Sequence, residues 1–204
     1  MSTLASIRAT LQIALDDAGA TVWTTAELDA HIQRALRDLS HHIPRQQKTA
    51  VATVAGSRDI TLALTDLINV VAVEWKPGQW PRSFIQFSVW GNVLTIIEDP
   101  EGDGSNCNIY WNSLHDISGT LTLPADHEET LILGAAWLAC EQQIADASNS
   151  VNTSGLQAPR EWGILSGRFR SEYEDRRDKR QGVRVTQMHG ATVPIPTQSS
   201  DPGP

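Results

Sequence analysis

The stretch TVWTTAELDAHIQRALRDLSHHIP, residues 21–44, contains the clearest structural signal of the sequence. Thr24 and Glu27 stand three positions apart, which is the spacing of a capping box at the N-terminus of a helix. Trp23 and Leu28 lie on either side of Thr24, at the two positions that form a hydrophobic staple. The stretch therefore predicts a helix that begins directly after Thr24.

The apolar residues of the same stretch fall on one face of this helix, because they recur every three or four positions. They are Leu28, Ile32, Leu36 and Leu39. Pro44 is expected to end the helix, since the residue before a proline is disfavoured in the helical conformation. The apolar face predicts that the helix packs against other parts of the fold.

A second helix is predicted before this one, over residues 3–17. Its apolar stripe consists of Leu4, Ile7, Leu11 and Leu15. Ser2 or Thr3 can cap its start, and Gly19 suits the end of a helix. The short connection between the two helices predicts an αα-hairpin, which we assign to residues 1–48.

The pattern changes to that of β-strands over residues 49–123. Val, Ile and Thr are frequent there, and turn residues interrupt them at short intervals. Gly91-Asn92 separates two apolar runs and predicts a tight hairpin turn. The run GTLTLP, residues 119–124, completes a set of about six predicted strands. This segment is expected to form a small antiparallel β domain.

Helical patterns return over residues 124–181. One predicted helix follows Pro124, and a second begins near Pro159, which suits the first turn of a helix. The apolar stripe of the second consists of Trp162, Leu165, Phe169 and Tyr173. The sequence thus predicts an α+β fold, in which a bundle of about four helices carries the β domain as an insertion.

The character of the sequence changes once more over residues 182–204. This segment holds four prolines and three glycines and has few residues that could form a core. We interpret it as an extended C-terminal arm that is disordered alone or ordered only against a partner. The residues predicted to bind that partner are its apolar anchors, Val183, Val185, Met188, Val193 and Ile195.

The composition restricts the classes of function. A net charge of −8 argues against a protein that binds nucleic acid by neutralising phosphates. The two cysteines, Cys107 and Cys140, have no metal-ligand spacing and are too few for a disulfide framework. The N-terminus lacks the pattern of a signal peptide, and no apolar run approaches the length of a membrane span. We expect a soluble protein that is made in a reducing compartment and contacts no membrane.

The search for catalytic or metal-binding patterns gives no candidate. The adjacent pair His41-His42 points in two directions on a helix, and its place in the last turn is explained by the helix dipole. The other histidines are single and lack the HExxH spacing: His31, His115, His127 and His189. The run EDPEGDG, residues 98–104, lacks the ligand order of a calcium loop. The sequence therefore predicts no catalytic residues, no cofactor and no metal, and we do not expect an enzyme.

Three segments resemble a known protein family, the tailed-bacteriophage head–tail connector (adaptor) proteins. They are the stretch from Leu4 to Arg45, the strand region with the turn WGN at residues 90–92, and the later run REWGILSGRFRSEYEDRR at residues 160–177. The first stretch contains the W-T-x-x-E-L-type helix of that family. The matching residues are Trp23, Thr24, Glu27, Leu28, Ile32, Ala35, Leu36 and Leu39. The resemblance covers roughly residues 3–181, although the long β segment departs from the most compact members of the family.

The resemblance implies a structural virion protein at the head–tail junction, synthesised in the host cytoplasm. Such proteins form a ring, commonly of twelve copies, that docks under the portal, extends the DNA channel and receives the next tail protein. DNA would pass through the ring without specific binding. A tail-completion or stopper protein and a virion-associated hydrolase are the alternatives.

Overall fold

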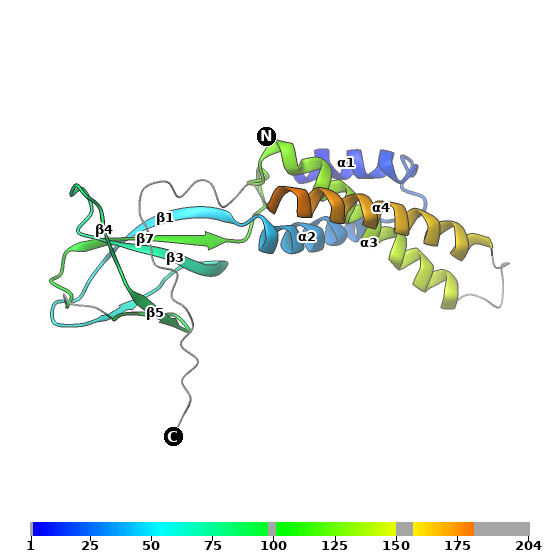
Figure 1. Ribbon diagram of the computed structural model, residues 1–204. Coiled ribbons are helices and arrows are strands. Elements are labelled where there is room, and N and C mark those ends of the chain that lie inside the picture. Colours follow the sequence, from blue (N-terminus) through cyan, green and yellow to red (C-terminus); the bar gives the residue numbers. More distant parts are fainter. Residues whose placement is uncertain (1, 98–100, 150–156, 182–204) are drawn as a thin grey trace, which may run out of the picture.

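The computed structural model describes residues 2–97, 101–149 and 157–181 and has an α+β fold (Figure 1). Figure 1 shows that the helices form one end of an elongated molecule and the strands form the other. The predicted fold class is therefore confirmed for the described residues. The predicted arm, residues 182–204, lies outside them.

In the part of the chain that the structure describes, four helices make up the helical end: α1 (Leu4–Ala14), α2 (Thr25–His42), α3 (Glu128–Asn149) and α4 (Gln157–Gln181). A short 3-10 turn, Ala125–His127, precedes α3. The apolar faces of the helices share one buried cluster, in which α3 packs against each of the other three. Arg8 of α1 also donates two hydrogen bonds to Asp29 of α2, at 2.6 and 2.7 Å.

The start of α2 has the predicted capping box. Glu27 Oε2 accepts a hydrogen bond from the backbone N–H of Thr24 at 2.7 Å, and Thr24 Oγ1 accepts one from the N–H of Glu27 at 3.3 Å. Trp23 and Leu28 are both buried in the helical core, and the Trp23 indole donates to the carbonyl of Ala139 at 3.3 Å. The cap is therefore confirmed, and it joins a tryptophan that anchors α2 to α3.

The first helix ends earlier than predicted, at Ala14 rather than at residue 17. The reason is the buried carboxylate of Asp17, which accepts hydrogen bonds from the backbone N–H groups of Thr21, Val22 and Trp23. Burial alone raises the pKa of Asp17, but these hydrogen bonds outweigh it and the pKa is lowered. Asp17 therefore organises the loop between α1 and α2 instead of continuing the helix.

Within the described residues, seven strands form two antiparallel sheets at the other end of the molecule. The larger sheet has the order β1 (Arg45–Ala52), β7 (Asn106–Ser113), β3 (Leu67–Trp75) and β4 (Ser83–Ile85). The smaller sheet has the order β2 (Asp59–Thr61), β6 (Val93–Ile96) and β5 (Phe87–Trp90). The two sheets share a second apolar core, separate from that of the helices.

The predicted β segment is correct in type but differs in one detail. The hairpin turn at Gly91-Asn92 is confirmed, with Gly91 at a positive φ of 61° between β5 and β6. The strand predicted over residues 119–124 is wrong. Thr120 forms only an isolated bridge with Thr3, because the alternating leucines of this run are buried in the helical core rather than in a sheet.

Candidate functional site

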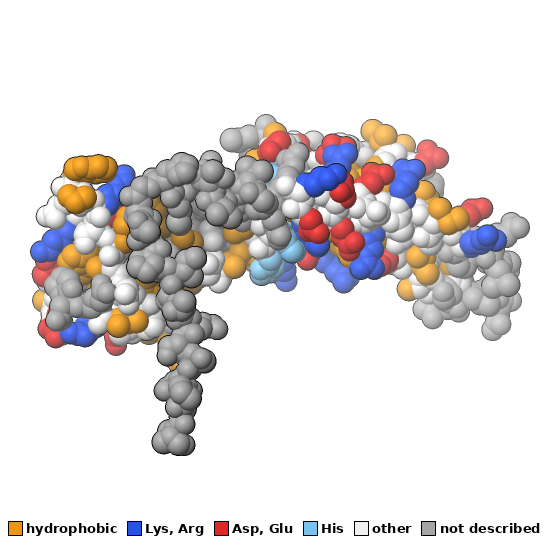
Figure 2. All heavy atoms as spheres, in the orientation of Figure 1, with side chains coloured by type: hydrophobic (Ala, Val, Ile, Leu, Met, Phe, Trp, Pro, Cys, Tyr) orange, Lys and Arg blue, Asp and Glu red, His pale blue; other side chains and the backbone are white. Residues whose placement is uncertain are grey.

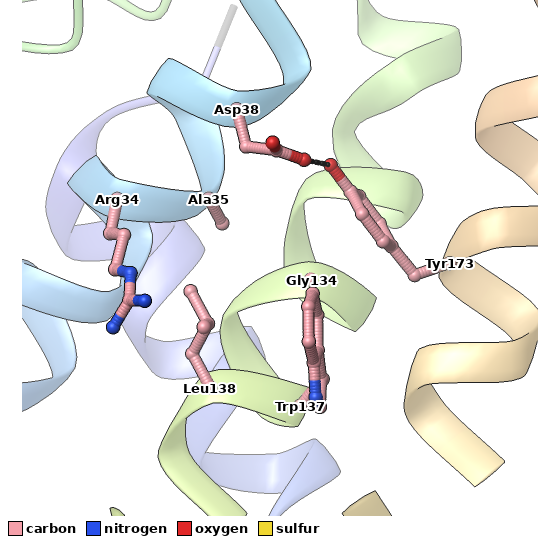
Figure 3. A pocket seen from close by; sticks show the side chains of 7 residues that line it. All are labelled: Arg34, Ala35, Asp38, Gly134, Trp137, Leu138 and Tyr173. Atoms are coloured by element: carbon pink, nitrogen blue, oxygen red, sulfur yellow. Dashed lines mark hydrogen bonds between the residues drawn. The ribbon is translucent and has the colours of Figure 1, made fainter. Parts of the chain in front are cut away.

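A shallow pocket of about 110 Å³ lies between α2 and α4, with α3 as its floor (Figure 3). Its lining residues are Arg34, Ala35, Asp38, Gly134, Trp137, Leu138 and Tyr173. The Tyr173 hydroxyl donates a hydrogen bond to Asp38 Oδ2 at 2.5 Å. Burial, followed by this bond and the charge of Asp38, raises the pKa of Tyr173. Tyr173 therefore stays protonated and ties α4 to α2.

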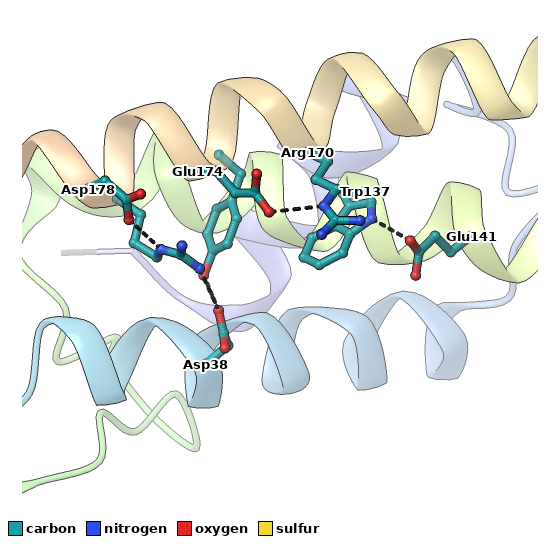
Figure 4. A network of polar contacts seen from close by, with 8 residues as sticks. Asp38, Trp137, Glu141, Arg170, Glu174 and Asp178 are labelled. Carbon is teal, nitrogen blue, oxygen red and sulfur yellow. Dashed lines mark hydrogen bonds and ion pairs between the residues drawn. The ribbon is translucent and has the colours of Figure 1, made fainter.

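Ion pairs and aromatic rings line the outer surface next to this pocket (Figure 4). Arg170 donates to Glu174 at 2.9 Å, and its guanidinium lies 5.2 Å from the centre of the Trp137 ring. The Trp137 indole in turn donates to Glu141 at 2.7 Å. The arginine is thus held on the ring by a carboxylate of its own helix, and its charge is neutralised locally.

The basic side chains of α4 are largely paired with carboxylates. Arg168 and Lys179 pair with acidic residues four positions away, at 3.7 and 2.6 Å. Arg176 pairs with Glu129 of α3, and Arg177 lies 2.9 Å from Asp178. Figure 2 shows the two signs of charge interspersed over the helical end. Such a mixed surface does not form a continuous track for phosphates.

A buried carboxylate, Glu74, lies on the outer face of the larger sheet. Its Oε2 accepts hydrogen bonds from Asn108 Nδ2 and from the Tyr110 hydroxyl, each at 2.8 Å. Arg82 lies 3.6 Å from the other oxygen. The hydrogen bond from Asn108, followed by that from Tyr110, lowers the pKa of Glu74. Glu74 therefore stays ionised at neutral pH, where it fixes its neighbours and is a poor proton donor.

The sequence alone does not predict the Glu74 cluster. Asn108 and Tyr110 alternate along one strand, which hints that they share a face. Their pairing with β3, where Glu74 lies opposite Asn108, depends on a sheet register that the sequence does not reveal.

Two of the histidines within the described residues, His31 and His115, join structural elements. His31 Nε2 lies 2.6 Å from Gln142 Oε1 and so connects α2 to α3. His115 hydrogen-bonds the carbonyl of Ile43 through Nε2 at 2.9 Å and therefore holds the junction between α2 and β1. His41 and His42 occupy the last turn of α2, as predicted. His189 lies outside the described residues.

Two observations concern metals and membranes. Within residues 2–97, 101–149 and 157–181, no three His, Cys, Asp or Glu side chains are grouped so that they could hold a metal ion. In the same ranges, no helix combines the length and the apolar character that a membrane crossing requires. Of the possible calcium loop, residues 98–100 are outside the described chain, and Asp103 accepts a hydrogen bond from the N–H of Ser105 at 2.9 Å.

Both cysteines are fully buried, one in each core: Cys107 in the sheets and Cys140 in α3. Burial raises the pKa of the Cys140 thiol to about 11, and it raises that of Cys107 as well. The thiols therefore stay protonated at neutral pH, and neither is an activated nucleophile.

Two tryptophans are strongly exposed at the β end. Trp80, in the loop between β3 and β4, is 90% exposed, and Trp90, next to the β5–β6 turn, is 89% exposed. Trp23, Trp75 and Trp111, in contrast, are buried in the two apolar cores. Exposure of a tryptophan ring to water is unfavourable in free energy, and tryptophans on a protein surface are typical of protein interfaces.

The predicted partner-binding residues, Val183, Val185, Met188, Val193 and Ile195, all lie outside the described residues. Their role therefore stays a prediction.

Comparisons with known proteins gave only distant similarities. No protein-family model and no curated protein matches the chain. Among solved structures, the chain is similar to a component of the "neck of native GTA particle computed with C12 symmetry", with 14% identity and a TM-score of 0.30 over 79% of this chain and 89% of that one.

Two further structures give similar values. One is the "neck of empty GTA particle computed with C6 symmetry", with 16% identity, a TM-score of 0.28 and coverage of 79% and 87% of the two chains. The other is the "virion of native gene transfer agent (GTA) particle", with 16% identity, a TM-score of 0.30 and coverage of 81% and 87%. TM-scores of this size carry no argument about fold or function.

Proposed function

We propose that this chain is a head–tail connector subunit of a tailed bacteriophage or phage-like particle. Copies of it form a ring below the portal, join the capsid to the tail and extend the DNA channel. The main support is the resemblance of residues 3–181 to adaptor proteins, centred on the helix that follows Trp23 and Thr24. These residues form the cap and the buried start of α2, so they specify how the helical bundle is built.

The surface of the chain suits a subunit that lets DNA pass. The net charge is −8, and the arginines of α4 are mostly engaged by carboxylates. A channel lined by such a surface repels the phosphate backbone, and DNA slides through without specific binding. The exposed Trp80 and Trp90 supply apolar area for contacts with neighbouring copies or with the downstream tail protein.

The arm, residues 182–204, docks on a partner within this assembly. Ordering such a segment costs about 1–2 kcal/mol per residue of conformational entropy, which only an extended contact can offset. Val183, Val185, Met188, Val193 and Ile195 provide the apolar side chains of that contact.

Electron microscopy of the full chain mixed with its portal tests the proposal. We expect rings attached to the portal, and we expect a chain truncated after Gln181 to fold with unchanged helical content but to fail to dock. The connector role is wrong if the full chain forms no complex with the portal. The role of the arm is wrong if the truncated chain docks with unchanged affinity.

A further inference from the structure

The first strand of the larger sheet has an open edge. β1 is eight residues long and, among the described strands, pairs only with β7. The opposite edge is β4, which has only three residues. A long open edge presents a row of unpaired backbone groups that can accept an additional strand, whereas a very short one is protected by its length. β1 is therefore the edge at which another strand can be added.

The side chains of β1 alternate between a half-buried face on the core side and an exposed face, which suits the addition of a strand. Gln47, Thr49 and Val51 point to the core side of the sheet and are half-buried, while Ala50 and Ala52 are small and exposed. Val51 packs against the apolar core from its margin. An added strand with apolar residues on the core side would extend this core beyond Val51.

Lysine often protects an edge strand from pairing, and β1 contains Lys48. Its ammonium group, however, lies 5.5 Å from the centre of the Tyr110 ring of β7. The side chain is therefore directed across the sheet, away from the open edge.

The arm has both the length and the pattern to occupy this edge. Its 23 residues span up to about 75 Å when extended, compared with about 27 Å for an eight-residue strand. In VRVTQM, residues 183–188, Val183 and Val185 alternate with Arg184 and Thr186, as in a strand with one apolar face. Proline, which weakens strand pairing, first occurs in the arm at residue 194.

We propose that residues 183–188 pair with β1 of a neighbouring copy as an additional antiparallel strand. Val183 lies opposite Val51, Arg184 opposite Ala50 and Val185 opposite Thr49. Both valines then face the core side, and Arg184 meets the small Ala50 rather than Lys48. The inference rests on the proposed ring, for which it names the surface that receives the proximal part of the arm.

The direction of the chain favours a neighbouring copy over the same chain. Arg177, close to the end of α4, lies 3.9 Å from Asp38 of α2, which shortly precedes β1. Figure 1 accordingly shows α4 ending beside the start of β1. An arm that folded back on its own chain would run parallel to β1, which is the less stable pairing. The arm of another copy can enter from the Ala52 end and run antiparallel.

Cross-linking of two introduced cysteines tests this pairing. Full-length chain with Ala50→Cys and Arg184→Cys is assembled on its portal and treated with a short bismaleimide, and the products are separated on a denaturing gel. The native cysteines are buried, and each single variant gives the background. We expect bands of two or more chains from the double variant only.

The other outcomes each overturn something specific. A cross-link within single chains places the arm on its own edge and refutes the exchange between copies. Rings without any cross-link refute the pairing but leave the connector role intact. If no ring forms on the portal, both proposals fall.

Two neighbouring substitutions test the predicted face. Val185→Asp places a carboxylate against the core side and is expected to abolish the multi-chain bands in the cross-linking background. Thr186→Asp, its matched control, lies on the opposite face near Lys48 and is expected to leave them unchanged. Equal effects of the two substitutions would refute a strand in this register.

Discussion

Both ends of the molecule bury tryptophans, but only the β end also has two that are almost fully exposed. At the helical end, Trp23 is 1% exposed and donates to the Ala139 carbonyl. Its ring centre lies 5.3 Å from that of Trp162, in an edge-to-face arrangement. At the β end, Trp80 and Trp90 are almost fully exposed. The difference indicates that the helical end is stabilised within one chain, whereas the β end has surface available for other molecules.

The comparison predicts its largest contrast for two substitutions. Trp23→Ala removes a buried ring and is expected to lower the free energy of unfolding by about 3–5 kcal/mol. Trp90→Ala removes an exposed ring and is expected to change it by less than about 0.5 kcal/mol. Urea denaturation of both variants measures the two values. Similar losses would show that the β end depends on Trp90 for its own fold.

The loop after α1 contains a buried carboxylate, Asp17, whose contribution to the stability of the helical end can be measured. Asp17→Asn leaves backbone N–H groups of a buried loop poorly satisfied, so we expect a loss of about 1–3 kcal/mol at pH 7. The lowered pKa of Asp17 means that its stabilisation is complete above the unfolded value of about 3.9 and is lost as the pH falls through the folded value. Unfolding measured from pH 7 to pH 3 should therefore show the difference between wild type and variant shrinking at the acid end. A difference that is independent of pH would contradict this role.

Two glycines of the helical end allow a matched test of its packing, because one faces a buried side chain and the other faces open space. A Cβ at Gly134 would lie 3.0 Å from the Tyr173 ring, which its bond to Asp38 holds in place. A Cβ at Gly163 of α4 would have no neighbour within 4 Å. We expect Gly134→Ala to destabilise by about 1–2 kcal/mol and Gly163→Ala to stabilise by about 0.5–1 kcal/mol. Thermal melts with shifts of the same sign for both would show that the α3–α4 contact is loosely packed.

Loss of the helix cap is expected to destabilise the chain less than the changes at Trp23, Asp17 and Gly134. Thr24→Ala removes one acceptor of the capping box and should cost about 1 kcal/mol. Thermal denaturation measures the shift, and a melting temperature equal to that of the wild type would mean that the cap contributes nothing to the rigidity of the helical end.

The two ends also differ in how far the sequence predicts them. The start of α2 was predictable to the residue, because the capping box and the apolar stripe act within a few positions of each other. The end of α1 was not predictable. The local sequence does not show whether Asp17 continues the helix or accepts hydrogen bonds from three N–H groups of the following loop. The strand predicted at residues 119–124 failed for a related reason, since alternating leucines suit a sheet and a helical core equally well.

At the candidate interaction surfaces, the sequence does not predict which side chains are buried and which are exposed. The charge pairs of Arg168, Arg170 and Lys179 follow from a spacing of four positions within α4. Glu74 becomes buried only through the register of β3 against β7, which is a long-range property. The exposure of Trp80 and Trp90, likewise, depends on where the sheets end, and no local pattern separates these two from the tryptophans of the core.

One cysteine is buried in each apolar core, so the two thiols can report independently on local opening of the two cores. A thiol reagent can label Cys140 only when the helices separate, and Cys107 only when the sheets do. Since neither thiol is activated, the labelling rates under native conditions measure how often each core opens. Binding of a partner at the β end would slow the labelling of Cys107 and leave the labelling rate of Cys140 unaltered. The ratio of the two rates therefore shows which end of the chain the partner binds.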